Sequence, residues 1–224
     1  MSVNITTYNE IKTELDQHAV SLVAVSKTKP VEDILELYNL GQRDFGENYV
    51  QELVDKQALL PKDIRWHFIG HLQSNKVKYI APFVHLIHGV DSLKLLKEIN
   101  KEAGKNNRVI DVLLQVYIAQ EETKFGLDEE ELKTLYNKNS DGLHELRNVR
   151  INGFMGMASF SDDLKKVRGE FRYLKSLFDW YADLPIANCQ LSILSMGMSS
   201  DYKIAVEEGS TMVRIGSLLF GARS

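Results

Sequence analysis

Short apolar runs alternate with amphipathic segments along the whole of this chain. Several of the runs lack a clean alternation of apolar and polar residues, which is typical of parallel strands that are buried on both faces. We therefore predict eight strands, at residues 22–25, 44–46, 66–69, 84–87, 110–116, 151–155, 190–194 and 212–215. The second of them is short and polar, and its pattern is the weakest.

The segments between these runs have the spacing expected of helices. After the first run, apolar residues recur at the i, i+3, i+4 and i+7 positions of one helical face. These residues are Val31, Ile34, Leu35 and Tyr38. Residues that favour a helix N-terminus precede three later segments. They are Ser92, Asp128 (with Glu131 placed as in a capping box) and the pair Asp162-Asp163 before the longest helix. We also expect a helix before the first strand.

Strands that alternate with helices in one uninterrupted chain indicate a single (β/α)8 barrel, which we expect to span residues 1–224 as one domain. No segment rich in Pro, Gly or Ser divides the chain into two parts. Periodicity alone does not show that a sheet closes on itself. A doubly wound open sheet is therefore the alternative fold.

Composition places the chain among soluble globular proteins. Of the 224 residues, 44% are hydrophobic and 26% are charged, close to the usual averages. The 27 Lys and Arg residues are outnumbered by 31 acidic residues, so there is no basic excess for nucleic acid. We expect neither a signal peptide nor a membrane span, because no apolar run approaches ~18 residues. Cys189 is the only cysteine, which excludes an internal disulfide and favours a cytoplasmic location. We expect its side chain to pack as a small apolar group.

Two lysines follow the first predicted strand, where a barrel carries its reactive groups. Lys27 comes directly after the strand and shortly before Pro30, at the start of a helix. A lysine between walls of low polarity can lose its proton and attack a carbonyl to form a Schiff base. Lys29 is the competing candidate, although strand alternation points the two side chains in different directions. A solvated lysine at a strand end is the simpler interpretation.

Small residues follow the seventh and eighth strands, at 195–201 and 216–217, and each turn leads into a helix. Such turns let backbone N–H groups approach an anion, and barrels often bind phosphate after these two strands. Arg214 ends an otherwise apolar strand and therefore needs a partner, which we expect to be a carboxylate, a phosphate or a ring nitrogen. A structural salt bridge is the alternative. Glu47, Asn48 and Lys124 are expected near the same rim.

The histidines do not predict a metal site. His67 and His71 are four residues apart, but the sequence between them is typical of a strand followed by a turn, so they need not share a face. Without a third clustered ligand, zinc is not expected. His85 and His88 are expected in the core or on the surface.

Several blocks of sequence resemble one known family. They are VSKTKP at 25–30, FGENYVQE at 45–52, WHFIG at 66–70, LQSNK at 72–76, LSMGMS at 194–199, STMVRIG at 210–216 and FGAR at 220–223. In this order they resemble the pyridoxal 5′-phosphate (PLP) homeostasis protein family over nearly the whole chain. The resemblance implies a barrel like the N-terminal domain of alanine racemase, with PLP as the cofactor.

Carried over position by position, the resemblance implies a set of cofactor-binding residues. Lys27 is similar to the lysine that forms the Schiff base, and Arg214 to the arginine that faces the pyridine nitrogen. The remaining matches are the phosphate turns Ser195, Ser199, Gly216 and Ser217, with Met198 between them, and the rim positions Asn48 and His71. An arginine at the ring nitrogen disfavours its protonation and weakens the cofactor as an electron sink.

Three functions follow as hypotheses. The first is a monomeric, non-catalytic PLP carrier that keeps the cofactor available, with apo PLP-dependent enzymes as partners. The second is an amino-acid racemase, which needs a second base on the opposite face of the cofactor. Alanine racemases take that base from an additional C-terminal domain, for which we expect no room in residues 216–224. The third, a PLP-free aldolase acting on a sugar phosphate, agrees with Lys27 and the phosphate turns but not with the family blocks.

Overall fold

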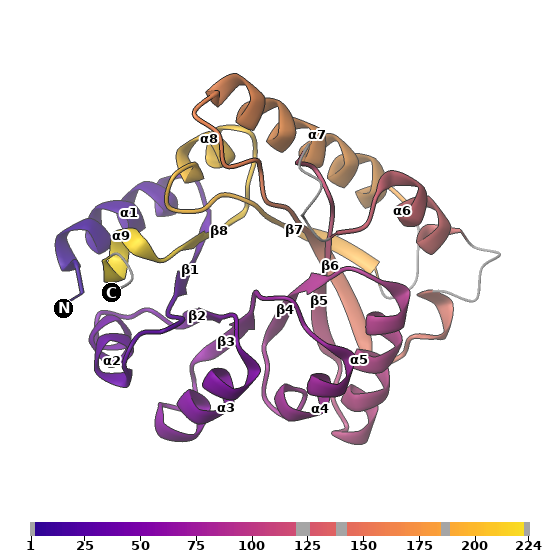
Figure 1. The fold of residues 1–224 in the computed structure, drawn as a ribbon, viewed down its shortest axis with the longest axis horizontal. Coiled ribbons are helices and arrows are strands. Elements are labelled where there is room, and N and C mark those ends of the chain that lie inside the picture. The colour runs from indigo at the N-terminus through magenta and orange to yellow at the C-terminus, as the bar shows by residue number, and fades with distance from the viewer. Residues whose placement is uncertain (1–2, 120–125, 138–142, 185–188, 222–224) are drawn as a thin grey trace.

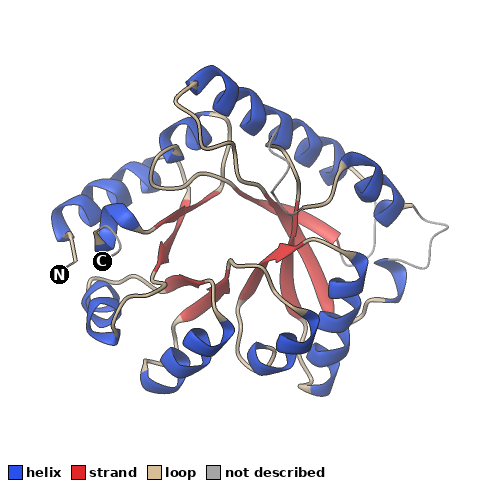
Figure 2. Ribbon diagram, in the orientation of Figure 1, coloured by secondary structure: helices blue, strands red, loops and turns tan. Residues whose placement is uncertain are grey.

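The structure is a computed structural model that describes residues 3–119, 126–137, 143–184 and 189–221. Lys124 lies outside these described residues. Parallel strands close into a barrel in the order β1 to β8, with helices around the outside (Figures 1 and 2). The strands are β1 (Ser21–Val25), β2 (Asp44–Glu47), β3 (Arg65–Phe68), β4 (Leu86–Val90), β5 (Ile110–Gln115), β6 (Val149–Met155), β7 (Cys189–Ser195) and β8 (Met212–Ile215).

Helices follow the strands in sequence and cover the outer face of the barrel (Figure 1). The α-helices are α1 (Ile5–Gln17), α2 (Val31–Asn39), α3 (Val50–Leu59), α4 (Val77–Ile80), α5 (Leu93–Lys105), α6 (Glu129–Tyr136), α7 (Leu164–Ala182), α8 (Tyr202–Glu207) and α9 (Ser217–Phe220). Two 3-10 helices are η1 (Ser74–Lys76) and η2 (Leu143–Glu145). No described helix is both long enough and apolar enough to cross a membrane.

Pairing between the first and last strands decides between the two folds expected from the sequence. Residues Ser21 to Ala24 of β1 pair in parallel with residues Met212 to Ile215 of β8. This pairing closes the sheet, so the (β/α)8 barrel is confirmed and the open doubly wound sheet is excluded. The expected N-terminal helix is confirmed as α1, which lies beside α9 (Figure 1).

The expected helix caps form. The side chain of Ser92 accepts a hydrogen bond from the Leu95 N–H at the start of α5. Asp128 and Glu131 make both hydrogen bonds of a capping box at α6. Asp163 caps α7, which at 19 residues is the longest described helix. Polar residues that compete for backbone N–H groups therefore located these boundaries correctly.

The fourth strand begins and ends later than predicted. We expected residues 84–87, but β4 runs from Leu86 to Val90. The Val84 N–H donates to the Ile80 carbonyl in the turn after α4, so this apolar residue lies before the strand. The strand then continues through His88 and Gly89. Because His88 is polar and Gly89 is small, the apolar pattern does not show that the strand extends this far.

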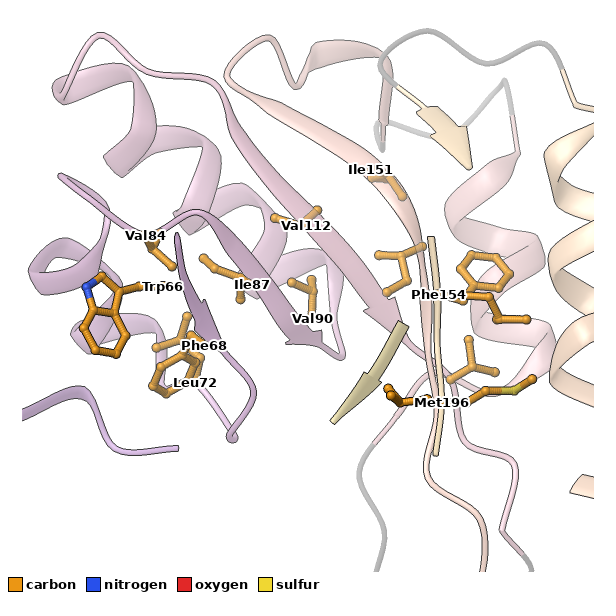
Figure 3. Packing of buried hydrophobic residues seen from close by; sticks show 14 of the residues in the cluster. Trp66, Phe68, Leu72, Val84, Ile87, Val90, Val112, Ile151, Phe154 and Met196 are labelled. Carbon is orange, nitrogen blue, oxygen red and sulfur yellow. The ribbon is translucent and has the colours of Figure 1, made fainter. Parts of the chain in front are cut away.

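Two clusters of apolar side chains form the core. The larger one fills the space between the strands and the helices, where Trp66, Phe68, Ile87, Val112 and Phe154 pack (Figure 3). The smaller one lies within the barrel, because strand residues alternate between its inner and outer faces. It consists of Val23, Leu86, Leu113, Met155 and Met212.

Candidate functional site

A cavity of about 460 Å³ lies beyond the C-terminal ends of β1, β2 and β8, between the loops that follow β6 and β7. Small-molecule and cofactor sites usually occupy roughly 300–1,000 Å³. The cavity brings together seven of the residues expected from the sequence to bind a ligand. These are Lys27, Asn48, Met198, Ser199, Arg214, Gly216 and Ser217.

The turn after β1 places Lys27 at the cavity. The Ser26 N–H donates to the Gly46 carbonyl, and the Ser26 hydroxyl donates to Oε1 of Glu47 at 2.6 Å. Thr28 has a φ of +62°, a left-handed conformation that is uncommon for residues other than glycine. Its N–H donates to Oε1 of Glu52 at 2.6 Å. Hydrogen bonds on both sides of Lys27 therefore fix the backbone from which its side chain extends.

A buried ion pair between Lys56 and Glu47 holds this turn in place. Nζ of Lys56, on α3, lies 2.8 Å from Oε1 of Glu47 and 2.7 Å from Oε1 of Glu52. It also donates to the Ser26 carbonyl at 2.7 Å. Burial raises the pKa of Glu47, and the Lys56 ammonium opposes that rise. Glu47 was expected at the cavity rim, but it points outward to α3 and positions the lysine turn instead.

Lys29 also lines the cavity, and its ammonium has a structural task. Nζ donates to the carbonyl of Phe220 at 2.8 Å and to that of Gly221 at 3.4 Å. These bonds tie the segment after β1 to the end of α9. The ammonium of Lys29 therefore holds two parts of the backbone together at the edge of the cavity.

Turns of small residues form another wall of the cavity. Gly197 has a φ of +94°, and the next residue, Met198, donates its N–H to Oδ1 of Asp201 at 2.6 Å. The Gly216 N–H donates to the Ser199 hydroxyl at 3.3 Å, which joins the turns that follow β7 and β8. A Cβ at Gly216 would lie 3.2 Å from both Cβ and the carbonyl oxygen of Val25. Glycine is therefore what allows this turn to approach β1 so closely.

Arg214 lines the cavity from within the barrel. Its Nη1 donates to the carbonyl and the hydroxyl of Ser195, at 2.8 and 2.7 Å, and Nη2 donates to the Gly156 carbonyl at 3.1 Å. Burial lowers the pKa of Arg214 to about 10, although Asp201 raises it. The guanidinium therefore stays charged at neutral pH while it is bonded to neutral oxygens, so the alternative of a structural salt bridge is wrong for the described residues.

Comparison with known proteins places the chain in a family. The family model "Alanine racemase, N-terminal domain" matches residues 6–224. A protein of Aquifex aeolicus named pyridoxal phosphate homeostasis protein is 46% identical over 209 residues, which cover 92% of this chain and 89% of that one. An Escherichia coli protein of the same name is 38% identical over 208 residues, which cover 91% and 86%.

The chain belongs to the pyridoxal phosphate homeostasis protein family.

Solved structures agree with this assignment. The structure of PipY from Synechococcus elongatus PCC7942 with PLP bound has a TM-score of 0.86 at 35% identity, with 96% of this chain and 99% of PipY covered. Alanine racemase from Bartonella henselae has a TM-score of 0.69 at 16% identity, with 97% of this chain and 59% of the racemase covered. The second match shows a shared barrel fold only.

The cavity has the chemistry needed for the cofactor after which the pyridoxal phosphate homeostasis proteins are named. Lys27 offers an amine for the PLP aldehyde, and the small-residue turns offer close approach to a phosphate. Oδ1 of Asn48, at the cavity, is buried and has no hydrogen-bond partner among the described residues. A buried acceptor without a protein partner is costly unless a ligand or water pairs with it.

Two of the residues implied by the family resemblance lie outside the cavity. Ser195 was expected in the phosphate turn, but β7 extends one residue beyond its predicted end, so Ser195 pairs with Met212 and its side chain is fully buried. His71 was expected at the cofactor rim. Its side chain is 49% exposed, and Nδ1 lies 3.3 Å from a carboxylate oxygen of Asp91, away from the cavity lining.

The other histidines lie in and below the barrel. His67 and His88 are buried in β3 and β4, whereas the side chain of His71 is half exposed in the turn after β3. His67, His85 and Asp44 place potential ligand atoms within 4.8 Å of one another, a cluster that sequence spacing did not reveal. Asp44 is the third clustered ligand that the sequence did not show. Both carboxylate oxygens of Asp44 accept hydrogen bonds from Arg65, so the cluster also contains an ion pair.

Proposed function

We propose that this protein binds PLP in the cavity, holds it through a Schiff base on Lys27 and keeps it available to the cell with little or no catalytic turnover. The observation that carries the proposal is the position of Lys27. A buried network from Lys56 through Glu47 and Ser26 holds the lysine turn at a cavity that also contains small-residue turns and a cationic donor.

The other cavity residues that the sequence singled out each have a role in binding PLP. Ser199, Gly216 and Ser217 receive the phosphate group, with Met198 beside them. Arg214 would donate a hydrogen bond to the ring nitrogen, and Asn48, whose Oδ1 has no partner among the described residues, would contact the cofactor. When bound, PLP supplies an electron sink, which is weakest when the ring nitrogen is unprotonated. A permanent donor such as Arg214 favours that unprotonated nitrogen.

The ionisable groups of the cavity favour binding over racemisation. A racemase needs a second acid or base opposite the lysine. Among the described lining residues, the ionisable side chains are Lys27, Lys29 and Arg214. Lys29 is hydrogen-bonded to two carbonyls, and Arg214 does not release its proton near neutral pH. The racemase alternative thus has no evident second base in this part of the chain.

The proposed function also concerns the location, the oligomeric state and the partners of the protein. We infer a cytoplasmic monomer, formed as one domain from residues 1–224, that passes PLP to apo PLP-dependent enzymes. The single thiol of Cys189 agrees with a reducing compartment. Burial raises the pKa of this thiol, so it is unsuited to act as a nucleophile.

Borohydride trapping tests the proposal. The full-length protein is mixed with PLP, its absorption spectrum is recorded, and the reduced protein is digested for mass analysis. We expect a PLP adduct on Lys27, loss of the adduct in Lys27→Ala and retention of the adduct on Lys27 in Lys29→Ala. An adduct on Lys29, or no uptake of PLP, would overturn the assignment. Exchange of the α-hydrogen of alanine in deuterated buffer would instead support the racemase.

A further inference from the structure

A continuous chain of hydrogen bonds crosses the interior of the barrel below the cavity. Nη1 of Arg214 lies 2.7 Å from the Ser195 hydroxyl, and that hydroxyl lies 3.2 Å from Nδ1 of His88. Nε2 of His88 lies 2.9 Å from Nδ1 of His67. Nε2 of His67 lies 3.0 Å from Oδ1 of Asp44. Its members come from β8, β7, β4, β3 and β2, and β7 and β8 lie across the barrel from β3 and β4 (Figure 1).

The chain of hydrogen bonds connects the two ends of the barrel through its buried interior. Arg214 lines the cavity at the C-terminal ends of the strands, whereas Asp44 is the first residue of β2 and lies at the other end. Ser195 and His88 are fully buried, and His67 is 1% exposed. The apolar side chains of Val23, Leu86, Leu113, Met155 and Met212 occupy the same interior. Polar groups persist in such surroundings only when they are hydrogen-bonded to one another.

The carboxylate end of the hydrogen-bond chain fixes its first bond, and rings with one proton each carry that direction to Ser195. Arg214 can only donate. Asp44 can only accept when it is ionised. Burial raises the pKa of Asp44, but hydrogen bonds from Arg65 and His67 outweigh that effect and hold the pKa well below its ordinary value. Asp44 is therefore a carboxylate at neutral pH.

From this fixed acceptor, each donor follows in turn. Nε2–H of His67 donates to Asp44, so a His67 ring that carries one proton accepts at Nδ1. Nε2–H of His88 donates to that nitrogen, and the Ser195 hydroxyl donates to Nδ1 of His88. The lone pairs of the hydroxyl then face Arg214. Burial, more than any other cause, lowers the pKa of His88 well below its ordinary value, which keeps this ring neutral.

We propose that His88 and His67 are positioning residues that hold the Arg214 guanidinium in the cavity and join it, through hydrogen bonds of a single direction, to the Asp44 carboxylate at the opposite end of the barrel. Aligned hydrogen bonds polarise one another in a medium of low dielectric constant. The chain of hydrogen bonds thus turns the oxygen of the Ser195 hydroxyl, its negative end, toward the buried Arg214 guanidinium. The other bonds of this guanidinium go to neutral carbonyls. The proposal rests on the proposed function only for the identity of the ligand that Arg214 meets.

Two further groups face the lower end of the chain. Arg65 pairs with Asp44, and the ring centre of His85 lies 5.4 Å from that of His67. His85 is on the accessible side, and burial lowers its pKa. These groups leave the two buried rings as the only links between Asp44 and Ser195 that the described hydrogen bonds show.

Nitrogen-15 NMR of the full-length protein without added PLP tests the direction of the chain. We expect the rings of both His67 and His88 to carry their proton on Nε2 at neutral pH, with assignments from His67→Gln and His88→Gln. A proton on Nδ1 of His88, or a doubly protonated His67, would reverse the chain and overturn the proposal. This measurement needs no cofactor, so it decides the question even if the proposed PLP binding fails.

Titration with PLP tests the effect on Arg214. His88→Phe keeps an aromatic ring of similar size but removes both hydrogen bonds of the ring. We expect it to weaken PLP binding about tenfold and to shift the absorption maximum of bound PLP. Leu86→Val, two residues earlier on β4 and also within the barrel, is the matched control. It should lower the unfolding temperature and leave the spectrum of bound PLP unchanged. Equal spectral changes in both variants would show that His88 serves packing alone.

Asp44→Asn tests the far end of the chain. An amide can donate as well as accept, so it no longer forces the proton of His67 onto Nε2. We expect a mixture of tautomers in the nitrogen-15 spectrum and a shift of the bound PLP spectrum in the same direction as for His88→Phe. If the tautomers of both rings and the PLP spectrum stay as in the unsubstituted protein, Asp44 does not set the direction of the chain.

Discussion

Nζ of Lys56 lies 2.8 Å from Oε1 of Glu47, and both side chains are buried between β2 and α3. The same ammonium bonds to the carbonyl of Ser26, next to Lys27. One ion pair thus joins the wall of the barrel to the turn that carries Lys27, the lysine proposed to form the Schiff base. Its effect on cofactor binding is indirect, through the backbone of that turn.

Replacement of this lysine is expected to affect folding and binding together. Lys56→Met keeps most of the aliphatic volume but leaves Glu47 buried without its cation. Breaking a buried ion pair in this way costs about 3–5 kcal/mol. We therefore expect the free energy of unfolding to fall by that amount in urea titrations, and the loosened Lys27 turn to bind PLP more weakly.

A surface lysine provides the comparison. Lys12 pairs with Asp16 one helical turn away on α1, and both side chains are exposed. Lys12→Met should change the free energy of unfolding by less than about 1 kcal/mol. Similar losses in the two variants would show that the Lys56 network carries no special weight.

The loop after β6 is tied down by one carboxylate. Glu170, buried on α7, accepts hydrogen bonds from the N–H and the hydroxyl of Ser159, at 2.6 and 2.7 Å. The neighbouring residues Met157 and Phe160 line the cavity. Glu170→Ala should speed hydrogen exchange at the Ser159 amide by tenfold or more, since hydrogen bonds to a charged group contribute roughly 1.5–3 kcal/mol each. An unchanged exchange rate at Ser159 would mean that other contacts hold the loop.

Two glycines with opposite surroundings predict opposite effects of the same substitution. A Cβ at Gly153, in β6, would lie 1.7 Å from the carbonyl oxygen of Ile193 on β7, whereas a Cβ at Gly169, in α7, would meet nothing within 4 Å. Gly153→Ala should cost at least ~3 kcal/mol because the backbone of β7 must move. Gly169→Ala should stabilise the protein by roughly 0.5–1 kcal/mol, as expected for an exposed position within a helix. Thermal unfolding of the two variants compares them directly.

Stability is expected to depend on acid through Asp44. Its pKa in the folded protein lies below the ordinary value of 3.8, because Arg65 and His67 outweigh the effect of burial. A carboxyl with a lowered pKa stabilises the fold above its unfolded pKa and loses this contribution as the pH falls through the folded value. Asp44→Asn should therefore lower the free energy of unfolding by roughly 1.5–3 kcal/mol at neutral pH. The difference from the unsubstituted protein should shrink as the pH falls below about 4.

Urea titrations over a range of pH values measure this difference. Asp16→Asn, at an exposed carboxylate on α1, should have an effect below about 1 kcal/mol throughout. A constant difference between Asp44→Asn and the unsubstituted protein down to low pH would contradict the assignment of Asp44 as the acidic group.

Local signals in the sequence predicted most of the fold. Apolar runs located the strands, and Ser92, Asp128 and Asp163 marked helix starts, because both signals depend only on residues that are close along the chain. Lys27 stood out because it follows an apolar strand, where a barrel carries its reactive groups. Arg214 stood out because a charge at the end of an apolar strand needs a partner. The location, the oligomeric state and the transfer of PLP to other enzymes stay predictions.

Contacts between distant residues could not be predicted in the same way. His88 and Ser195 are 107 positions apart, and nothing local distinguishes a histidine in a polar chain from one packed in the core. Lys56 resembles an ordinary surface residue of an amphipathic helix, yet it is 7% exposed because it reaches back to Glu47. Ser195 was misplaced by a single residue of strand length, which is enough to turn a side chain from the loop into the barrel.

The cavity spans the seam between β1 and β8, so it forms only when the first and the last strand are paired. Lys27 follows one strand and Gly216 the other, and the bond from Lys29 to the Phe220 carbonyl joins residues 191 positions apart. A ligand that contacts both sides of this seam stabilises the closed barrel. At a free ligand concentration of a hundred times the dissociation constant, this contribution is about 2.7 kcal/mol. During synthesis the lysine emerges early and has no partner wall until the eighth strand has been made. The cofactor can therefore be held from both sides only after the barrel has closed.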